Sequence, residues 1–596
     1  MVSRASPVRE RLVEIFRELL GRLVGLHDFI APWQLTGTYV ALMATTGAHL
    51  HSYGAIPNIQ SSGDPDGSTK DSWVKANEND AAGDENEDSP RYQDVPFAIL
   101  FLFQLIVVMI YGIHKGSWDM GDMGSGGGGE TSGSNAFDDD RVVTDVEAHV
   151  ARAVFGLLLP CTAVAFFLAH VGTAMIIPMF PETAVKTCLA MSLGSTVVLA
   201  ILVILSNPAW YTWISMFFAV GIMAYYVRRV WCMTPFAAAN LTMGIKSVAE
   251  NWGLYLISIF MMMVSFAFFV FWFYAANGIF FQNISTDVDA NDPDNGDISW
   301  GIFFLLLVSL YWTGTCLLNI VRVTTSGVVG TWCFVPEEAS GCCSSAVISS
   351  FVRSMTYSFG SICFGSLLEA VVTALRVLAE NARDQSREDN DGCASILYCV
   401  LECILSLLED IIEYFNQWAY VLIGIYGYSY LESGRRVMEL FRARGWTAII
   451  TNDLVGYVLS FTSVVVGILT GLCAVSIESM ASSGNGSGVS FFFGDVGSFV
   501  IARWIAFFIG IFVGIFISSI MMNVLKGAVN TVIVCYADGP QKLEQNHPQM
   551  TYNMARSWVS VFPDCGVRIP VVSAMTVGDG ASEPTKSGAA FPTVDL

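Results

Sequence analysis

The chain has 596 residues, of which 53% are hydrophobic and only 14% are charged, and its mean hydropathy is +0.54. A soluble domain carries about 25% charged residues, so this composition excludes an ordinary soluble protein and indicates an all-α, polytopic membrane protein. The net charge of −22 excludes a protein organised around a basic nucleic-acid-binding surface.

The first 94 residues form an N-terminal region that we expect to lie outside the membrane. Residues 8–26 predict an amphipathic helix, with apolar residues on one face and arginines opposite. The apolar segment 29–50 is interrupted by Pro32, Gly37 and Gly47, and we do not count it as a span. Residues 61–94 are acidic and rich in glycine and serine, a composition typical of disorder.

The region 95–534 contains ten apolar segments long enough to cross a bilayer, because about 20 helical residues cover its hydrocarbon core. These predicted spans are 95–113, 151–178, 187–206, 209–227, 253–281, 299–323, 346–378, 395–427, 453–476 and 499–534. A count of eight is the alternative if 346–378 and 397–427 both re-enter from the same side. Residues 535–596 are predicted to form a tail.

The orientation follows from the lysines and arginines of the short loops, which favour the cytoplasm. The loops 228–252 and 428–452 are basic, whereas 282–298 and 479–498 contain neither lysine nor arginine. Both termini are therefore predicted to be cytoplasmic. Independently, the glycosylation sequons at Asn283 and Asn485 fall in the two loops predicted to lie outside, whereas the sequon at Asn240 falls inside and should not be modified.

No catalytic or metal-binding pattern emerges from the sequence. The seven histidines are scattered, without HExxH or cysteine–histidine metal spacing. The glycine-rich runs at 124–129 and 484–488 do not lie between a strand and a helix, so they are linkers rather than phosphate-binding loops. We therefore expect no enzyme activity, no metal site and no cofactor.

The segment 300–335 (WGIFFLLLVSLYWTGTCLLNIVRVTTSGVVGTWCFV) carries polar and aromatic residues at mid-depth, where polar groups need a partner or a water-filled cavity. Tyr311 and Trp312 are candidate ligands for a quaternary ammonium, which is recognised by electron-rich ring faces because it cannot donate a hydrogen bond. The alternative is core packing. Asn319, about two turns further on, could shape such a site or instead bridge two helices.

Glu369 lies within the apolar stretch FGSLLEAVVTALR. A carboxylate inside a membrane is a candidate counter-ion for a cationic substrate, or a proton carrier. The alternative is a structural pair with Arg353 or Arg376. Four tyrosines near the end of the eighth predicted span are expected to form an interfacial belt; they are Tyr420, Tyr426, Tyr428 and Tyr430.

Several separated blocks resemble the choline-transporter-like family: 311–335, MTPFAAANL at 233–241, SFGSICFGSLLEAV at 358–371, 414–459 and CYADGPQKLEQNHPQM at 535–550. The short loop after the first span, which lacks cysteines, is more similar to fungal and protist members. The resemblance implies a helical carrier for choline, and for ethanolamine as an alternative, with proton exchange proposed for the family. Glu369 falls where the family pattern has an aliphatic residue, so no role for it follows from the resemblance.

Together these observations predict a secondary transporter for choline or a related organic cation. The cation would bind among Tyr311, Trp312, Asn319 and Glu369, in a protein of the plasma membrane or of an internal membrane whose remaining partners are lipids. The rival hypothesis is a membrane scaffold that transports nothing and works through its N-terminal helix and acidic tract. The sequence does not predict an oligomeric state.

Overall fold

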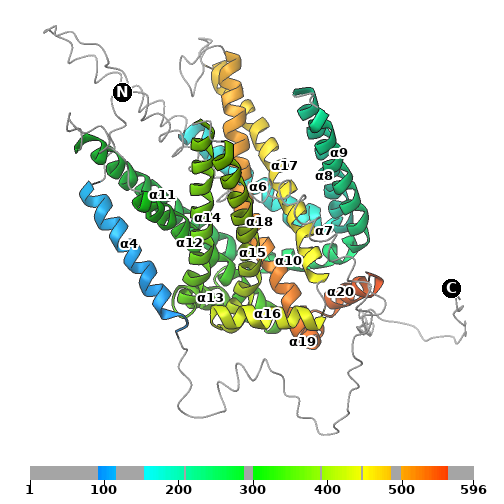
Figure 1. Cartoon of the computed structure of the whole chain (residues 1–596). Helices are drawn as coiled ribbons and strands as arrows, with labels where there is room; N and C mark the ends of the chain where they lie inside the picture. Colours follow the sequence, from blue (N-terminus) through cyan, green and yellow to red (C-terminus); the bar gives the residue numbers. More distant parts are fainter. Residues whose placement is uncertain are drawn as a thin grey trace, which may run out of the picture.

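The computed structural model describes residues 92–115, 154–206, 210–286, 300–388, 392–444, 447–484 and 499–561. Every regular element in these ranges is helical (Figure 1). The predicted helix 8–26, the acidic tract before residue 92 and the tail beyond residue 561 lie outside them.

The longer helices form a bundle (Figure 1). Their apolar composition explains why they form in a membrane, where a helix satisfies every backbone group internally. They are α4 (Val95–Lys115), α6 (Leu159–Val171), α8 (Pro181–Ser206), α9 (Trp210–Val230), α11 (Gly253–Thr286), α12 (Trp300–Phe334), α14 (Phe359–Glu388), α15 (Gly392–Tyr426), α17 (Thr447–Gly484) and α18 (Phe499–Asp538). Short π-helical segments, η1 (Val154–Leu158) and η2 (Gly172–Ile176), and the brief α7 (Ile177–Met179) extend α6 at its ends.

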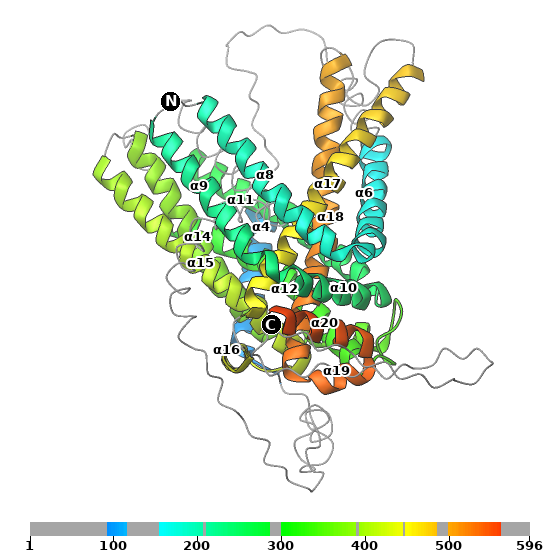
Figure 2. The same cartoon turned by 90° about the vertical axis from the view of Figure 1, so that its right-hand side faces the viewer.

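Nine helical stretches among the described residues are long and apolar enough to cross a membrane. They correspond to nine of the ten predicted spans, which confirms a polytopic, all-helical membrane protein. The tenth, 395–427, is α15. It is long enough, at about 50 Å for 35 residues, but it carries Glu402, Glu409 and Asp410. Because α14 and α15 are both continuous and lie side by side (Figure 2), their geometry favours two full crossings over two re-entrant segments.

The predicted span 346–378 is corrected by the structure, which divides it into two helices. The amphipathic α13 (Ser345–Met355) is capped at its start by the Ser344 hydroxyl, which accepts from the Val347 N–H, and α14 begins only at Phe359. Residues 356–358 form a turn between the two helices, and Thr356 leaves the helical conformation with a φ of −122° and a ψ of −82°. The membrane-spanning part therefore starts later than the sequence predicts.

Short amphipathic helices lie across one end of the molecule, which we call the rim (Figure 1). The rim comprises α13, α16 (Tyr430–Arg444), α19 (Pro540–Asn546) and α20 (Pro548–Val561). The predicted loop 228–252 is also largely helical, as η3 (Trp231–Met233) and the well-buried α10 (Thr234–Glu250), which packs on α18 and α20. The region after 535, predicted as a tail, therefore begins with two helices folded onto the bundle.

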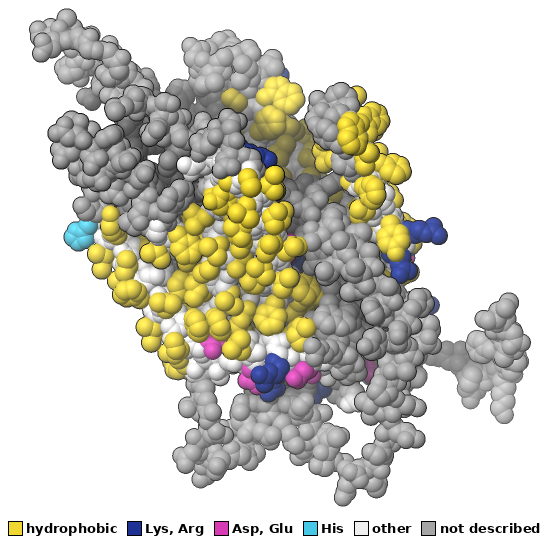
Figure 3. All heavy atoms as spheres, in the orientation of Figure 1, with side chains coloured by type: hydrophobic (Ala, Val, Ile, Leu, Met, Phe, Trp, Pro, Cys, Tyr) yellow, Lys and Arg dark blue, Asp and Glu magenta, His cyan; other side chains and the backbone are white. Residues whose placement is uncertain are grey.

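The bundle has a buried centre and a lipid-like exterior. In α12, 56% of the residues in the most apolar stretch are buried, and in α14 the share is 50%, whereas in α4 it is only 11%. These shares place α12 and α14 at the centre of the bundle. The exposed residues of α4 are large and apolar, including Ile99 and Phe103, each 63% exposed. Figure 3 shows a broad hydrophobic face with charged side chains at its lower edge, as expected of a surface that contacts acyl chains.

Helices α17 and α18 form a closely packed hairpin that depends on glycine. A Cβ atom on Gly514 would lie 2.7 Å from the Cα of Gly467, and one on Gly510 would lie 2.8 Å from the Cα of Gly471. Small residues spaced four apart allow two backbones to approach this closely in a membrane. Helix packing is thus the role of these glycines in the structure.

Candidate site in the centre of the bundle

Trp312 on α12 is held at the junction with α4 and α14. It is only 3% exposed, and its indole N–H donates to the Cys363 carbonyl at 2.9 Å. The ring of Phe101 meets it edge-on, with centroids 5.3 Å apart. The polar edge of the indole is therefore satisfied within the protein. The face of the Trp312 ring is electron-rich and is the part that attracts a cation.

Tyr311 is also buried, at 2% exposed. Consecutive residues of an α-helix are separated by about 100° around the axis, so Tyr311 and Trp312 point in different directions. Residue 319, seven positions after Trp312, returns to nearly the same face. Accordingly Trp312 and Asn319 both bond to α14, at Cys363 and Ser366.

Asn319 is 1% exposed and bridges helices that are distant in sequence. Its Nδ2 donates to the Ser366 hydroxyl on α14 at 3.0 Å and to the Tyr420 hydroxyl on α15 at 3.3 Å. Its Oδ1 accepts from Arg322 Nη1 at 3.1 Å. The bridging role that the sequence left as an alternative is present in the structure.

Glu369 lies half-buried on α14, one turn beyond Gly365. Its Oε2 accepts from Asn416 Nδ2 on α15 at 3.3 Å. The two arginines considered as partners from the sequence have other acceptors: Arg353 donates to the Gly424 carbonyl, and Arg376 pairs with Glu409 at 2.8 Å.

Asn416 joins Glu369 to the rim. It is fully buried; its Nδ2 also donates to the Gly365 carbonyl at 3.1 Å, and its Oδ1 accepts from the Tyr430 hydroxyl at 2.5 Å. We call the six residues that meet here the polar cluster: Asn319, Ser366, Glu369, Asn416, Tyr420 and Tyr430. It consists of two hydrogen-bonded groups, Asn319 with Ser366 and Tyr420, and Asn416 with Glu369 and Tyr430. The rings of Tyr420 and Tyr430 lie next to each other, with centroids 6.4 Å apart. The structure thus places Asn319 and Glu369, two of the four predicted site residues, in adjacent groups, with Trp312 bonded one turn away on α14.

Gly365 makes room for this cluster. A Cβ atom there would lie 2.4 Å from the Tyr420 hydroxyl oxygen and 2.6 Å from a ring carbon of Tyr430. A larger residue would therefore push both tyrosines out of position. The approach of α14 to α15 and α16 at this level depends on the absence of a side chain.

Two of the four tyrosines predicted as an interfacial belt have a different role. Tyr420 and Tyr430 are 1% and 2% exposed and belong to the polar cluster, so the prediction was wrong for these two. Tyr428 does lie at the rim, where its ring stacks under Arg436 with 3.9 Å between guanidinium carbon and centroid. The chain reverses at Gly427, which adopts a φ of +73°, and this reversal carries Tyr430 back into the bundle.

Sequence reasoning missed Ser366 and Asn416 as members of the site, although both are fully buried. A usable signal existed for Asn416, because an asparagine inside a long apolar segment needs a partner. No sequence pattern identifies that partner.

Asp94 fastens the start of α4 to the same region. Its Oδ2 accepts from the Ser361 hydroxyl at 2.6 Å and from the backbone N–H of Tyr430 at 2.9 Å. Asp94 has a φ of +50°, which is uncommon for a residue other than glycine. One carboxylate therefore connects α4, α14 and α16 at the rim.

The pKa of Tyr430 is raised by burial and by the nearby charge of Glu369. Its hydroxyl consequently stays protonated and able to donate at physiological pH. This protonation state matches its hydrogen bond to the Asn416 oxygen.

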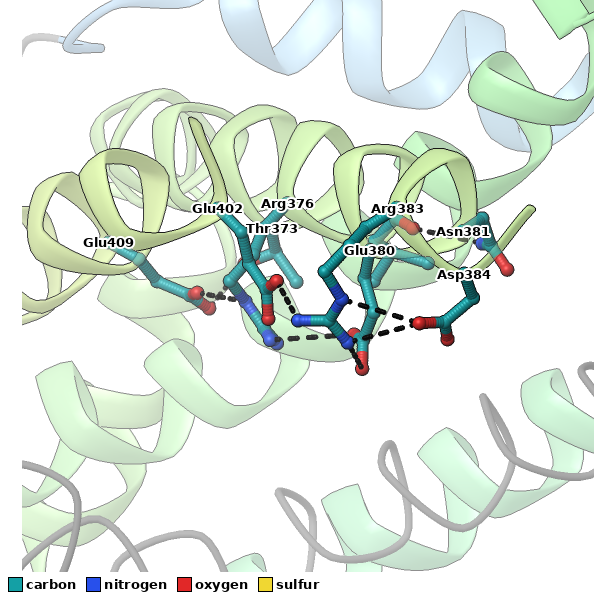
Figure 4. A network of polar contacts seen from close by, with 9 residues as sticks. Thr373, Arg376, Glu380, Asn381, Arg383, Asp384, Glu402 and Glu409 are labelled. Carbon is teal, nitrogen blue, oxygen red and sulfur yellow. Dashed lines mark hydrogen bonds and ion pairs between the residues drawn. The ribbon is translucent and has the colours of Figure 1, made fainter. Parts of the chain in front are cut away.

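A second polar network connects the far halves of α14 and α15 (Figure 4). Arg376 pairs with Glu409 at 2.8 Å, and Glu409, 5% exposed, also accepts from Thr373 at 2.7 Å. Arg383 pairs with Glu402 and, at 3.3 Å, with Asp384. Mutual pairing of this kind is what lets two charged helices enter a membrane together.

Two of the three glycosylation sequons, those at Asn240 and Asn283, fall among the described residues. Asn283 falls in the last turn of α11, which extends to Thr286, and Asn485 lies outside the described residues. Asn240 is fully buried in α10. Among the described residues no group of three or more histidines, cysteines or acids could hold a metal ion.

The helices and their buried polar centre define a polytopic integral membrane protein, and comparison with known families makes this specific. The family model described as "Plasma-membrane choline transporter" matches residues 210–541, more than half of the chain. The protein belongs to this choline-transporter-like family. The match covers the helices from α9 to α18 and contains all six residues of the polar cluster.

Its relatives are mostly fungal. The chain is 26% identical over 473 residues to Protein PNS1 of Mycosarcoma maydis, covering 78% of this chain and 83% of the relative. It is 23% identical over 505 residues to Protein PNS1 of Saccharomyces cerevisiae, covering 80% and 85%. Protein PNS1 of Yarrowia lipolytica is 30% identical over 266 residues, 44% of each chain. The expected similarity to fungal members is confirmed.

Proposed function

We propose that the protein is a secondary carrier for choline or a related small organic cation such as ethanolamine. The observation that carries this proposal is the composition of the bundle centre. Glu369 brings a carboxylate to this centre, where it accepts from Asn416, and α12 brings the buried rings of Tyr311 and Trp312. A quaternary ammonium is bound by negative charge and by aromatic ring faces. Because it has no N–H to donate, the protein does not have to provide a hydrogen-bond acceptor for it.

The burial of these residues supports transport by alternating access. Trp312, 3% exposed, and Asn319, 1% exposed, are inaccessible to a solute unless helices around them separate. In the proposed cycle the closed packing of α4, α12, α14 and α15 opens first to one side and then to the other. The cation binds between Trp312 and Glu369, and Asn319 shapes the site. Tyr311, which points in another direction from α12, would join the site only after the helices rearrange.

Glu369 offers a way to couple transport to protons. A carboxylate that binds a cation when ionised and a proton otherwise can exchange one for the other across the membrane. We propose that the rim faces the cytoplasm, consistent with the basic loops at 228–252 and 428–452, and that the protein resides in the plasma membrane.

The test is uptake of radiolabelled choline by proteoliposomes that contain the purified protein, with and without an imposed pH gradient. Saturable uptake above that of empty vesicles supports the carrier, and stimulation by the gradient supports proton exchange. Competition by unlabelled ethanolamine defines the substrate range. Absence of uptake by folded protein, with choline or other organic cations, would overturn the proposal.

A further inference from the structure

The amide of Asn416 can satisfy its neighbours in only one orientation. Its NH₂ group faces two acceptors, the Gly365 carbonyl at 3.1 Å and Glu369 Oε2 at 3.3 Å, and its oxygen accepts from the Tyr430 hydroxyl at 2.5 Å. Rotating the amide by half a turn would direct its oxygen at a carbonyl and a carboxylate. Because a buried polar group without a hydrogen-bond partner costs considerable free energy, the surroundings fix this orientation.

Tyr430 is itself fixed at both ends. Its backbone N–H donates to Asp94 Oδ2 at 2.9 Å, and its ring packs between those of Phe364 and Phe415, at centroid distances of 4.9 and 5.8 Å. A continuous series of contacts therefore runs from Asp94 at the rim through Tyr430 and Asn416 to the carboxylate of Glu369.

We propose that Asn416 is a positioning residue for Glu369, and that the Tyr430 hydroxyl, anchored through Asp94, holds Asn416 in the orientation that this requires. The inference rests on the proposed function, in which Glu369 is the counter-ion of the transported cation. Asn416 and Tyr430 do not touch the cation; they determine where the Glu369 carboxylate points and keep a hydrogen-bond donor on it.

The substitution Tyr430→Phe tests this with little risk to folding, because it removes one oxygen atom and keeps the ring contacts. Without the hydroxyl, Asn416 loses the donor that distinguishes its two orientations, and Glu369 is held less well. We expect the KM for choline to rise about 3- to 10-fold, the size expected for one lost hydrogen bond, with Vmax nearly unchanged. Tyr428→Phe is the matched control, since the Tyr428 hydroxyl accepts from Arg436 Nη1 at 2.6 Å at the rim.

A double-mutant cycle separates positioning from a general structural effect. If Tyr430 acts through Glu369, Tyr430→Phe should not raise KM further in a Glu369→Gln background. An equal rise in both backgrounds, or no rise in the wild-type background, would overturn the inference.

The same four proteins distinguish failure of this inference from failure of the proposed function. If wild type does not transport choline, the proposed function fails, and the cycle is then read from thermal unfolding in detergent. Non-additive losses of stability for Tyr430→Phe and Glu369→Gln would still support the connection through Asn416. Additive losses would overturn it.

Discussion

Asn319 of α12 and Tyr420 of α15 are hydrogen-bonded to each other at 3.3 Å although 101 residues separate them in the chain. Ser366 of α14 accepts from the same amide at 3.0 Å, so one side chain joins the three central helices. In a membrane, apolar packing alone gives little preference for one neighbour over another, and polar contacts of this kind determine which helices meet.

Asn319→Ala should therefore lower the free energy of unfolding by about 1–3 kcal/mol, because Ser366 and Tyr420 lose their buried donor. The measurement is the midpoint of thermal or denaturant unfolding in detergent. Asn381→Ala is the control, since the Asn381 amide donates to the Val377 carbonyl within its own helix. Equal losses for the two variants would contradict a bridging role for Asn319.

The ion pair between Arg376 and Glu409 predicts a strong asymmetry between single and double substitutions. Arg376→Met leaves the Glu409 charge buried without this partner and should destabilise the protein by about 3–5 kcal/mol, whereas Arg376→Met with Glu409→Leu should recover most of that loss. By comparison, Lys186→Met at the exposed pair with Glu182 on α8 should cost about 0–1 kcal/mol. If the double variant were no more stable than Arg376→Met, the unpaired Glu409 charge would not be the cause of the destabilisation.

The contact between α17 and α18 predicts opposite effects for the same substitution at two glycines. Gly514→Ala places a Cβ atom 2.7 Å from the Gly467 Cα and should destabilise by about 1–3 kcal/mol through overpacking. Gly456→Ala, also in this hairpin, meets no atom within 4 Å and should be neutral or stabilising by about 0.5–1 kcal/mol, because alanine favours a helix. The measurement is the thermal unfolding of both variants. A loss of stability in Gly456→Ala equal to that in Gly514→Ala would refute the predicted difference between the two positions.

His547 predicts that docking of the C-terminal helices weakens in acid. Its ring stacks on Trp332, with centroids 3.9 Å apart, and its Nε2 bonds to the Trp332 carbonyl at 3.0 Å. Burial lowers the pKa of His547, an effect that Lys246 reinforces and that the Trp332 carbonyl and Glu250 oppose.

Since the unfolded chain binds this proton more readily than the folded protein, the stabilisation is fully present above about pH 6.5 and is lost as the pH falls below it. His547→Phe keeps an aromatic ring on Trp332 but cannot titrate. The difference in unfolding temperature between wild type and this variant should therefore shrink from about pH 7.5 to about pH 5.5. A difference that stays constant or grows would contradict the assignment.

The membrane-spanning helices were predictable because their signal is local. A long apolar run can be recognised from consecutive residues alone. Nine of the predicted spans have counterparts among the described helices. The rim was not predictable in the same way: α13 and α16 are amphipathic, and α13 was merged with α14 because its apolar face resembles part of a span.

The candidate site was only partly predictable for a different reason. Trp312, Asn319 and Glu369 stand out as polar or aromatic residues within apolar segments, but their partners come from other helices. Asn416 lies 47 residues from Glu369 in the chain, and the bond between them exists only after α14 and α15 have packed. Tyr430 was assigned to an interface because its sequence position is next to a predicted loop, whereas the turn at Gly427 returns it to the core.

The central claim is that the aromatic and acidic centre of the bundle binds the transported cation, and choline uptake by proteoliposomes carrying Trp312→Ala tests it most directly. Trp504→Ala is the matched control, because Trp504 on α18 is 56% exposed on the outer surface of the bundle. We predict that saturable uptake is lost in Trp312→Ala and retained in Trp504→Ala, with both proteins folded and inserted. Saturable uptake by Trp312→Ala with the KM of the wild type would contradict the account and place the binding site elsewhere.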